Sequence, residues 1–298
     1  MDMTGQVVVI TGAGRGIGRA AAMACAQAGA AVVVNDADAD VAKATARDIQ
    51  DAGGQAVANA ASIGTPEAAE DCVQTALTAF GRLDAFCANA GVLRDNVLWK
   101  TDPADFDLVI QTHLRGAFTC GQAAAKHMRA ASQGGAIILV SSVAGQRGNF
   151  GQTAYAAAKA GVAAMARTWS MELARDRIAV NAIVPTALTR MVATIPGLAD
   201  HVAAAERGEP IAKNLRQNAG LGRPDDVAPL FVFLASPAGR AVTGQCIGIG
   251  GDRLSVWSHP VETAVSLRDG GWTADSISDA WERELSPHRQ SVGVDLNL

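Results

Sequence analysis

Short apolar runs alternate with longer alanine-rich stretches along the first half of the chain. The run at residues 6–10 is β-branched and is bounded by glycine turns, which is typical of a buried strand. The alanine-rich stretch at 19–28 predicts a helix that ends at Gly29. The order then repeats, with strands expected at 31–34, 55–60 and 83–87 and helices at 37–52 and 66–80. This alternation predicts an α/β fold, a doubly wound parallel sheet with helices on both faces.

The composition describes a compact soluble protein, with 49% hydrophobic and 18% charged residues. The net charge of -4 gives no reason to expect nucleic acid as a partner. No apolar run reaches the ~18 residues of a membrane span, and no signal-like start is present, so we expect a cytoplasmic protein. The cysteines lack metal-ligand spacing and are expected to be reduced, buried thiols, with no metal site; they are Cys25, Cys72, Cys87, Cys120 and Cys246.

A glycine-rich turn, residues 11–18, lies between the first strand and the first helix. Gly12 permits the tight turn, Gly16 lets the backbone approach a phosphate, and Gly18 lets the helix pack closely on the strand. The helix N-terminus then supplies amide donors to a pyrophosphate. The sequence therefore predicts a dinucleotide-binding turn here.

An acid follows the second strand at the position where a ribose diol is expected. Asp36 would accept hydrogen bonds from the diol and would repel a 2′-phosphate, which favours NAD over NADP. The alternative is a solvated turn residue or helix cap, since Asp38 and Asp40 lie alongside.

The only tyrosine of the chain, Tyr155, has Lys159 four positions later. On a helix these two side chains share one face, because i and i+4 are neighbours there. A nearby ammonium favours the phenolate, so we expect Lys159 to lower the pKa of Tyr155 from ~10 toward the working range of a base.

These motifs, taken in order, resemble the short-chain dehydrogenase/reductase family. The match runs from about residue 5 to 252 and includes its TGxxxGIG loop at 11–18, its NAG motif at 89–91, a catalytic serine at Ser142, its YxxxK pair at Tyr155 and Lys159, and its N-x-x-x-P segment at Asn181, Pro185 and Thr189. The resemblance implies a Rossmann-like fold for residues 1–252.

The resemblance also implies roles. Tyr155 would be the general acid/base, Lys159 would hold the cofactor ribose, and Ser142, favoured over its neighbour Ser141, would donate a hydrogen bond to the substrate oxygen. Residues expected to contact NAD are Gly12, Arg15, Gly16, Ile17, Gly18, Asp36, Asn89, Ala90, Gly91, Tyr155, Lys159, Pro185 and Thr189.

His113 stands where the family usually has a catalytic asparagine. It could replace that asparagine in a water-linked relay to Lys159, since an imidazole both donates and accepts hydrogen bonds. The alternative is a helix histidine with a structural hydrogen bond. Two further departures are the lack of an acid at 59–62 and Thr186 in place of the usual glycine.

The context of His113, together with residues 33–36, 148–152 and 227–230, looks like the (3R)-hydroxyacyl-CoA dehydrogenase domain of peroxisomal multifunctional enzymes and its bacterial relatives. The resemblance implies an NAD-dependent dehydrogenase for a small-molecule substrate, a (3R)-hydroxyacyl-CoA. Alternatives are a hydroxysteroid dehydrogenase, a 3-oxoacyl-carrier-protein reductase, or a dinucleotide-binding sensor that has lost the chemistry.

Two later segments add to this layout. Residues of about 189–221 form a long connection with many apolar side chains, and we expect a substrate lid there. Residues 253–298 carry Trp257, Trp272 and Trp281 and a predicted helix at 275–285. We expect this extension to pack on its own domain or on a neighbouring subunit. The small residues of the helix expected from 154 to 173 favour a homodimer or homotetramer.

Overall fold

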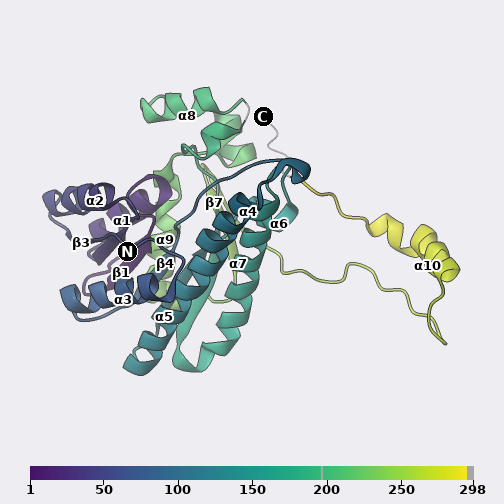
Figure 1. Ribbon diagram of the computed structural model, residues 1–298, viewed down its shortest axis with the longest axis horizontal. Helices are drawn as coiled ribbons and strands as arrows, with labels where there is room; N and C mark the ends of the chain where they lie inside the picture. Colours follow the sequence, from purple (N-terminus) through teal and green to yellow (C-terminus); the bar gives the residue numbers. More distant parts are fainter. Residues whose placement is uncertain (196, 294–298) are drawn as a thin grey trace.

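A single sheet of eight strands forms the centre of the computed structural model, which describes residues 1–195 and 197–293 (Figure 1). The strand order is β3-β2-β1-β4-β5-β6-β7-β8. The strands are β1 (Val7–Thr11), β2 (Ala31–Asn35), β3 (Gln55–Asn59), β4 (Ala85–Ala88), β5 (Gly135–Val140), β6 (Ile178–Pro185), β7 (Cys246–Gly250) and β8 (Arg253–Trp257). The order reverses between β1 and β4, and the carboxyl ends of strands at such a point form a ligand-binding crevice.

Helices cover both faces of the sheet, so the expected doubly wound α/β fold is confirmed. The helices are α1 (Gly16–Gln27), α2 (Ala39–Asp51), α3 (Pro66–Phe80), α4 (Pro103–Ile110), α5 (Gly116–Ala131), α6 (Val143–Arg147), α7 (Thr153–Glu172), α8 (Ala199–Glu206), α9 (Ala228–Ala235) and α10 (Ala274–Ala280). One core lies under α1, α2 and α9, and the other lies under α3, α5 and α7. Alternate residues of β1 supply the two cores, because successive strand side chains point to opposite faces.

The last strand departs from the expected parallel arrangement. β8 pairs antiparallel with β7, whereas β1 to β7 pair in parallel. The reason is local: Gly251, with φ of +52°, and Asp252 close a tight turn between β7 and β8. A two-residue connection leaves no room for a crossover and can join only antiparallel strands.

Standard end signals define the predicted helices. Thr65 accepts a hydrogen bond from the Ala68 amide at the start of α3, and Gly81 ends that helix in the left-handed conformation. The five cysteines are buried and free, as expected. Burial raises the pKa of the Cys25 thiol to about 12, so this thiol is not a nucleophile at neutral pH.

The segment after β6 forms a small folded unit of its own. It contains α8 and buries an apolar cluster that includes Leu198, Val202 and Leu215. Arg216 holds the segment in place, because it pairs with Asp226 at 3.0 Å and with Asp252 at 2.8 Å. Its function as a lid remains a proposal.

The extension begins at β8 and then leaves the body. Its expected helix lies where it was predicted, as α10 followed by a π turn at Trp281–Leu285. Figure 1 shows α10 standing away from the sheet and its covering helices. Residues 294–298 of the extension lie outside the described range.

Candidate active site

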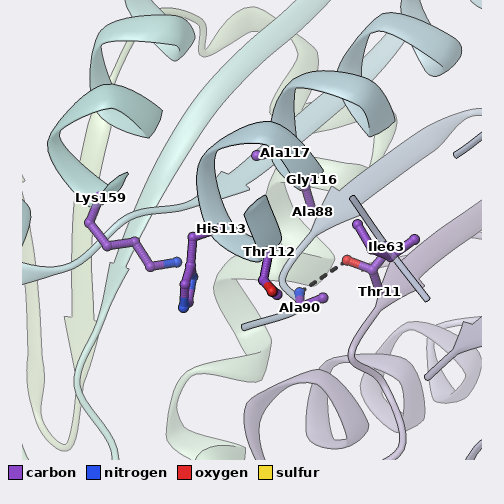
Figure 2. A pocket seen from close by; sticks show the side chains of 9 residues that line it. All are labelled: Thr11, Ile63, Ala88, Ala90, Thr112, His113, Gly116, Ala117 and Lys159. Atoms are coloured by element: carbon purple, nitrogen blue, oxygen red, sulfur yellow. Dashed lines mark hydrogen bonds between the residues drawn. The ribbon is translucent and has the colours of Figure 1, made fainter. Parts of the chain in front are cut away.

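The glycine turn and the loop after β4 are braced against each other. The Thr11 hydroxyl accepts hydrogen bonds from the Asn89 and Ala90 amides, each at 3.0 Å; Figure 2 draws the second. The Asn89 side chain donates to the Thr11 carbonyl at 2.9 Å and the Gly12 carbonyl at 3.2 Å. Asn89 therefore fixes the floor of the crevice, and Ala90 lies beside the turn.

The glycine turn leaves room for a phosphate. Gly12 has φ of +62°, and a Cβ added there would lie 2.8 Å from the Ala90 Cα. A Cβ on Gly16 would lie 3.9 Å from the Thr189 methyl group, so Thr189 closes the turn from the far side. No side chain caps the N-terminus of α1. Its first amides therefore fit a pyrophosphate.

Asp36 lies directly after β2, beside the glycine turn. One carboxylate oxygen accepts a hydrogen bond from the Gly14 amide at 3.1 Å, and the other accepts from the Asp38 amide at 3.1 Å. The helix-cap role belongs to Asp38, whose carboxylate accepts from the Val41 amide. Each oxygen of a carboxylate has a second lone pair, so Asp36 fits a ribose diol.

The predicted catalytic residues come from two neighbouring helices. Ser142 follows β5 and starts α6, where its hydroxyl accepts from the Ala144 amide at 3.2 Å. Tyr155 and Lys159 lie on α7, with the ammonium nitrogen 5.6 Å from the centre of the tyrosine ring. Ser141 is buried and donates to the Lys159 carbonyl at 2.7 Å. Ser141 thus makes a structural hydrogen bond, which favours Ser142 as the candidate catalytic serine.

Burial has the largest effect on the pKa values of Tyr155 and Lys159. It lowers the pKa of Lys159 to about 7, and the buried ammonium donates to the Val140 carbonyl. Burial also raises the pKa of Tyr155, while the Ser142 hydroxyl opposes that rise and the Asp95 carboxylate adds to it. The expected lowering of the Tyr155 pKa by Lys159 is thus wrong for this structure, because the cost of burying the phenolate is the larger effect.

His113 lies in a π turn (Gln111–Arg115) that joins α4 to α5, and π turns of this kind are frequent at functional sites. Its ring meets Tyr155 edge-on at 5.1 Å. The Nε2 atom lies 2.7 Å from the Val92 carbonyl oxygen and 3.0 Å from the Val92 amide nitrogen. A Cβ on Gly91 would overlap the imidazole. The glycine of the NAG motif thus makes room for this ring.

The other imidazole nitrogen has no partner. His113 Nδ1 is buried and makes no hydrogen bond to any residue in the described ranges. Burial, followed by the charge of Lys159, lowers the pKa of His113 to about 3, so the ring is neutral. Figure 2 shows the end of Lys159 directed toward this ring, in a narrow pocket between Thr11 and α5. The Val92 contact is the structural hydrogen bond of the alternative interpretation, and the relay remains a prediction for which Nδ1 is the free nitrogen among the described residues.

Some residues of the site were not predicted from the sequence. Gln152, at the start of α7, donates to the Asp95 carboxylate at 2.7 Å, and the Asn96 amide donates to the Gly151 carbonyl at 2.8 Å. The loop after β4 is thereby tied to the helix of Tyr155. The separation of 57 residues between Asp95 and Gln152 gave no local signal for this contact.

The remaining predicted positions have mixed surroundings. Pro185 ends β6 at the crevice, and Ile17 packs partly on the core beneath α1. Arg15 is exposed and pairs with Asp38 at 2.9 Å. Asn181 is buried and binds the Val242 carbonyl and the Gln245 amide, so it joins β6 to the start of β7 instead of facing the crevice.

Across the described ranges, no group of three or more His, Cys, Asp and Glu residues is placed to hold a metal ion. In the same ranges, no helix is long and apolar enough to cross a membrane.

A dinucleotide crevice with a serine, a tyrosine and a lysine at its edge defines a class of oxidoreductases, and the chain belongs to the short-chain dehydrogenase family. The family model described as short chain dehydrogenase matches residues 6–196. Members of this family use a nicotinamide cofactor, and the residues described above fit one.

Three relatives illustrate the range of the family. The chain is 35% identical to mouse peroxisomal multifunctional enzyme type 2 over 94% of its own length, but it spans only 36% of that protein. It is 35% identical to the 3-oxoacyl-acyl-carrier-protein reductase FabG of Thermotoga maritima, over 84% of this chain and 98% of the reductase. The crystal structure of a short chain dehydrogenase from Mycobacterium avium superimposes with a TM-score of 0.84 at 34% identity, covering 99% of both chains.

Proposed function

We propose that this oxidoreductase uses NAD to oxidise a secondary alcohol, and that its substrate is a (3R)-hydroxyacyl-CoA. The observation that carries the proposal is the position of Tyr155. Its ring centre lies 5.6 Å from the Lys159 ammonium nitrogen, and the Ser142 hydroxyl, just after the carboxyl end of β5, acts to lower its pKa. Ligands of open α/β sheets bind at this edge.

The chemistry divides among the three side chains. In the oxidative direction, Tyr155 as the phenolate accepts the proton of the substrate hydroxyl, and in the reverse direction the phenol returns it. Ser142 donates a hydrogen bond to the same substrate oxygen. The Lys159 ammonium would donate hydrogen bonds to the ribose hydroxyls of the cofactor. The nicotinamide, when bound, supplies the hydride acceptor or donor.

Charge near Asp36 favours NAD over NADP. The carboxylate would repel a 2′-phosphate, and the nearby cation Arg15 already pairs with Asp38. An arginine free to bind the extra phosphate is the usual requirement for NADP. The relevant test measures kcat/KM with each cofactor, and a preference for NADP would contradict this part of the proposal.

Apolar surface around the crevice supports an acyl substrate. Leu98, Trp99 and Phe150 are each more than two-thirds exposed, and we call these three side chains the apolar rim. The folded segment after β6, with its own apolar cluster, is the proposed lid. The exposed cations Arg190 and Lys213 lie on that segment and are candidates for contact with the CoA phosphates.

Two further substrates remain as alternatives. The similarity to FabG over nearly the whole of that reductase favours a 3-oxoacyl-carrier-protein reductase, and an apolar crevice also suits a steroid ring. The decisive experiment is a turnover screen of the pure protein with NAD and NADP against hydroxyacyl-CoA, acyl-carrier-protein, steroid and simple alcohol substrates. Highest kcat/KM with an (R)-hydroxyacyl-CoA and NAD supports the proposal, and a preference for the carrier-protein substrate with NADPH rejects it.

A non-catalytic sensor is the alternative outside enzymes. Tyr155→Phe removes only the hydroxyl, so NADH binding, followed by fluorescence, should be unchanged while kcat falls by roughly 10² to 10⁴-fold. Ser141→Ala, next to the catalytic serine, is the matched control and should keep the catalytic groups intact. Equal turnover by wild type and the Tyr155→Phe variant would show that the phenol is not the acid/base.

His113 is proposed as a relay residue in its neutral form. With a pKa of about 3 it does not change charge in the assay range, so it would pass protons by exchange between Nδ1 and Nε2. We expect His113→Asn to preserve turnover and His113→Phe, which fills the space without a hydrogen-bonding nitrogen, to reduce it. Equal turnover by both variants would leave only the structural role.

A further inference from the structure

Asp95, in the loop after β4, is held by an amide side chain that is itself fixed on both sides. The Gln152 Oε1 atom accepts a hydrogen bond from the Asn149 side chain at 2.9 Å. The Nε2 atom of the same amide donates to the Asp95 carboxylate at 2.7 Å. The amide of Asn96, the next residue in the chain, donates to the Gly151 carbonyl at 2.8 Å. These neighbouring contacts fix the Asp95 carboxylate relative to α7.

The carboxylate lies at the first turn of the helix that carries Tyr155. Gln152 immediately precedes α7, and Tyr155 follows it by three residues. Positions three apart on a helix are neighbours on one face, so a group bound by Gln152 lies on the side of Tyr155. The charge of Asp95 reaches the phenol: burial raises the pKa of Tyr155, the Ser142 hydroxyl lowers it, and the Asp95 carboxylate raises it further. The contact also joins the two segments that expose the apolar rim.

The other groups around Tyr155 carry little charge in alkaline solution, where a phenol ionises. Lys159, whose nitrogen lies 5.6 Å from the ring centre, has its pKa lowered to about 7 by burial. His113, which meets the ring edge-on, is neutral because burial lowers its pKa to about 3. Ser142 contributes an uncharged hydroxyl. Of the described residues that contact or act on Tyr155, Asp95 is therefore the one that stays charged.

We propose that Asp95 is a positioning residue whose negative charge, held beside Tyr155 by Gln152, keeps the phenol protonated and so moves alcohol oxidation to more alkaline solution. In oxidation the phenolate accepts the substrate proton, so the charge disfavours the active form of Tyr155. In ketone reduction the phenol donates that proton, so the same charge favours the active form. The effect on turnover rests on the proposed function, whereas the effect on the phenol does not.

Titration of the only tyrosine in the chain tests the proposal without any turnover. The ultraviolet absorbance that accompanies phenolate formation reports on Tyr155 alone, and Tyr155→Phe supplies the background. Asp95→Asn keeps an oxygen that can accept from Gln152 and removes only the charge. We expect the absorbance midpoint of this variant to lie about one pH unit below that of wild type. The difference should shrink in high salt, because Asp95 is exposed. The same midpoint in both proteins overturns the proposal.

Two further variants separate the charge from the hydrogen bond. Gln152→Glu combined with Asp95→Asn reverses donor and acceptor, so it keeps the bond and returns one negative charge to the pair. Its midpoint should return to that of wild type, and a midpoint equal to that of Asp95→Asn alone overturns the proposal. Asp105→Asn is the matched control, because it removes an exposed carboxylate that pairs with Arg94 at 3.2 Å. It should leave the midpoint unchanged, and a shift as large as that of Asp95→Asn would assign the effect to net charge instead.

The pH profile of turnover tests the consequence for the reaction. With NAD and an alcohol substrate, the acid limb of kcat/KM for Asp95→Asn should move to lower pH by about one unit, which makes turnover on that limb about tenfold higher than in wild type. A purely structural role predicts lower turnover at every pH with the limb unmoved, and that result overturns the proposal. An absorbance midpoint that shifts in a protein that oxidises no alcohol with either cofactor supports the role of Asp95 and rejects the proposed function.

Discussion

Lys159 should reduce the stability of the protein at neutral pH, and replacing it should separate stability from activity. The ammonium group is buried, and burial lowers its pKa from 10.5 to about 7. Lys159→Met keeps a long apolar side chain and removes the charge. We expect this variant to lose turnover, because the cofactor ribose loses its proposed donor, and yet to resist unfolding better than wild type at pH 6.

The sign and size follow from the two pKa values. The unfolded chain holds the Lys159 proton up to about pH 10.5, whereas the folded chain releases it near pH 7. Between these values the unfolded state binds more protons, so stability rises with pH, and the penalty is fully present below pH 7. At about 1.4 kcal/mol for each pKa unit, the penalty is at most about 5 kcal/mol. Leaving the Val140 carbonyl without its donor costs about 1 to 3 kcal/mol, so the expected net gain at pH 6 is roughly 2 to 4 kcal/mol.

Urea unfolding at pH 6, 7.5 and 9, followed by fluorescence, measures this difference. The gain of the variant over wild type should be largest at pH 6 and should shrink toward pH 9. Lys126→Met, on the exposed side of α5, controls for the general loss of a lysine and should show no such trend. A free-energy difference between Lys159→Met and wild type that is the same at all three pH values would refute the reasoning.

Three further changes test other parts of the structure. When the pH is lowered to 4.5, His113→Asn should lose less of its free energy of unfolding in urea than wild type does. The native imidazole, with its pKa lowered to about 3, stays neutral, while the unfolded one is protonated below about 6.5. An equal loss of unfolding free energy in both proteins contradicts this. Asp36→Ser should reduce the NAD to NADP ratio of kcat/KM at least tenfold, and an unchanged ratio argues against charge selection. Asp84→Asn should cost about 2 to 3 kcal/mol in urea unfolding, since the buried carboxylate accepts from the Val7 amide at 2.9 Å and pairs with Arg82 at 2.7 Å; a cost below 0.5 kcal/mol would show that these contacts do not stabilise the fold.

Local sequence patterns predicted the parts of the candidate site that depend on residue spacing. The glycine turn lies between a strand and a helix, Asp36 follows the second strand, and Tyr155 and Lys159 lie on one helix, all as predicted. Each of these depends on a few neighbouring residues, whose backbone geometry fixes where the side chains point. The alternation of strands and helices is also a local pattern, and it predicted the parallel sheet.

The other features of the candidate site depend on contacts between segments that are far apart in the sequence. Asn181 belongs to a family motif, yet its side chain joins two strands. The π turn at His113 and the overlap that only Gly91 avoids depend on how α4 and α5 pack against the loop after β4. A spacing pattern records neither of these, because each requires residues far apart in sequence to meet.

The sequence by itself therefore determined which groups are candidates for the site: a glycine turn for a dinucleotide, an acid for the ribose, and a serine, a tyrosine and a lysine for the proposed chemistry. Only the tertiary structure decided their protonation, since a pKa depends on how completely a group is removed from water. Burial raises the pKa of Tyr155 and lowers those of Lys159 and His113, whereas spacing alone predicted the opposite for Tyr155. The tertiary structure also shows α10 standing away from the sheet and its covering helices, because a helix pattern specifies an apolar face but not the surface that covers it.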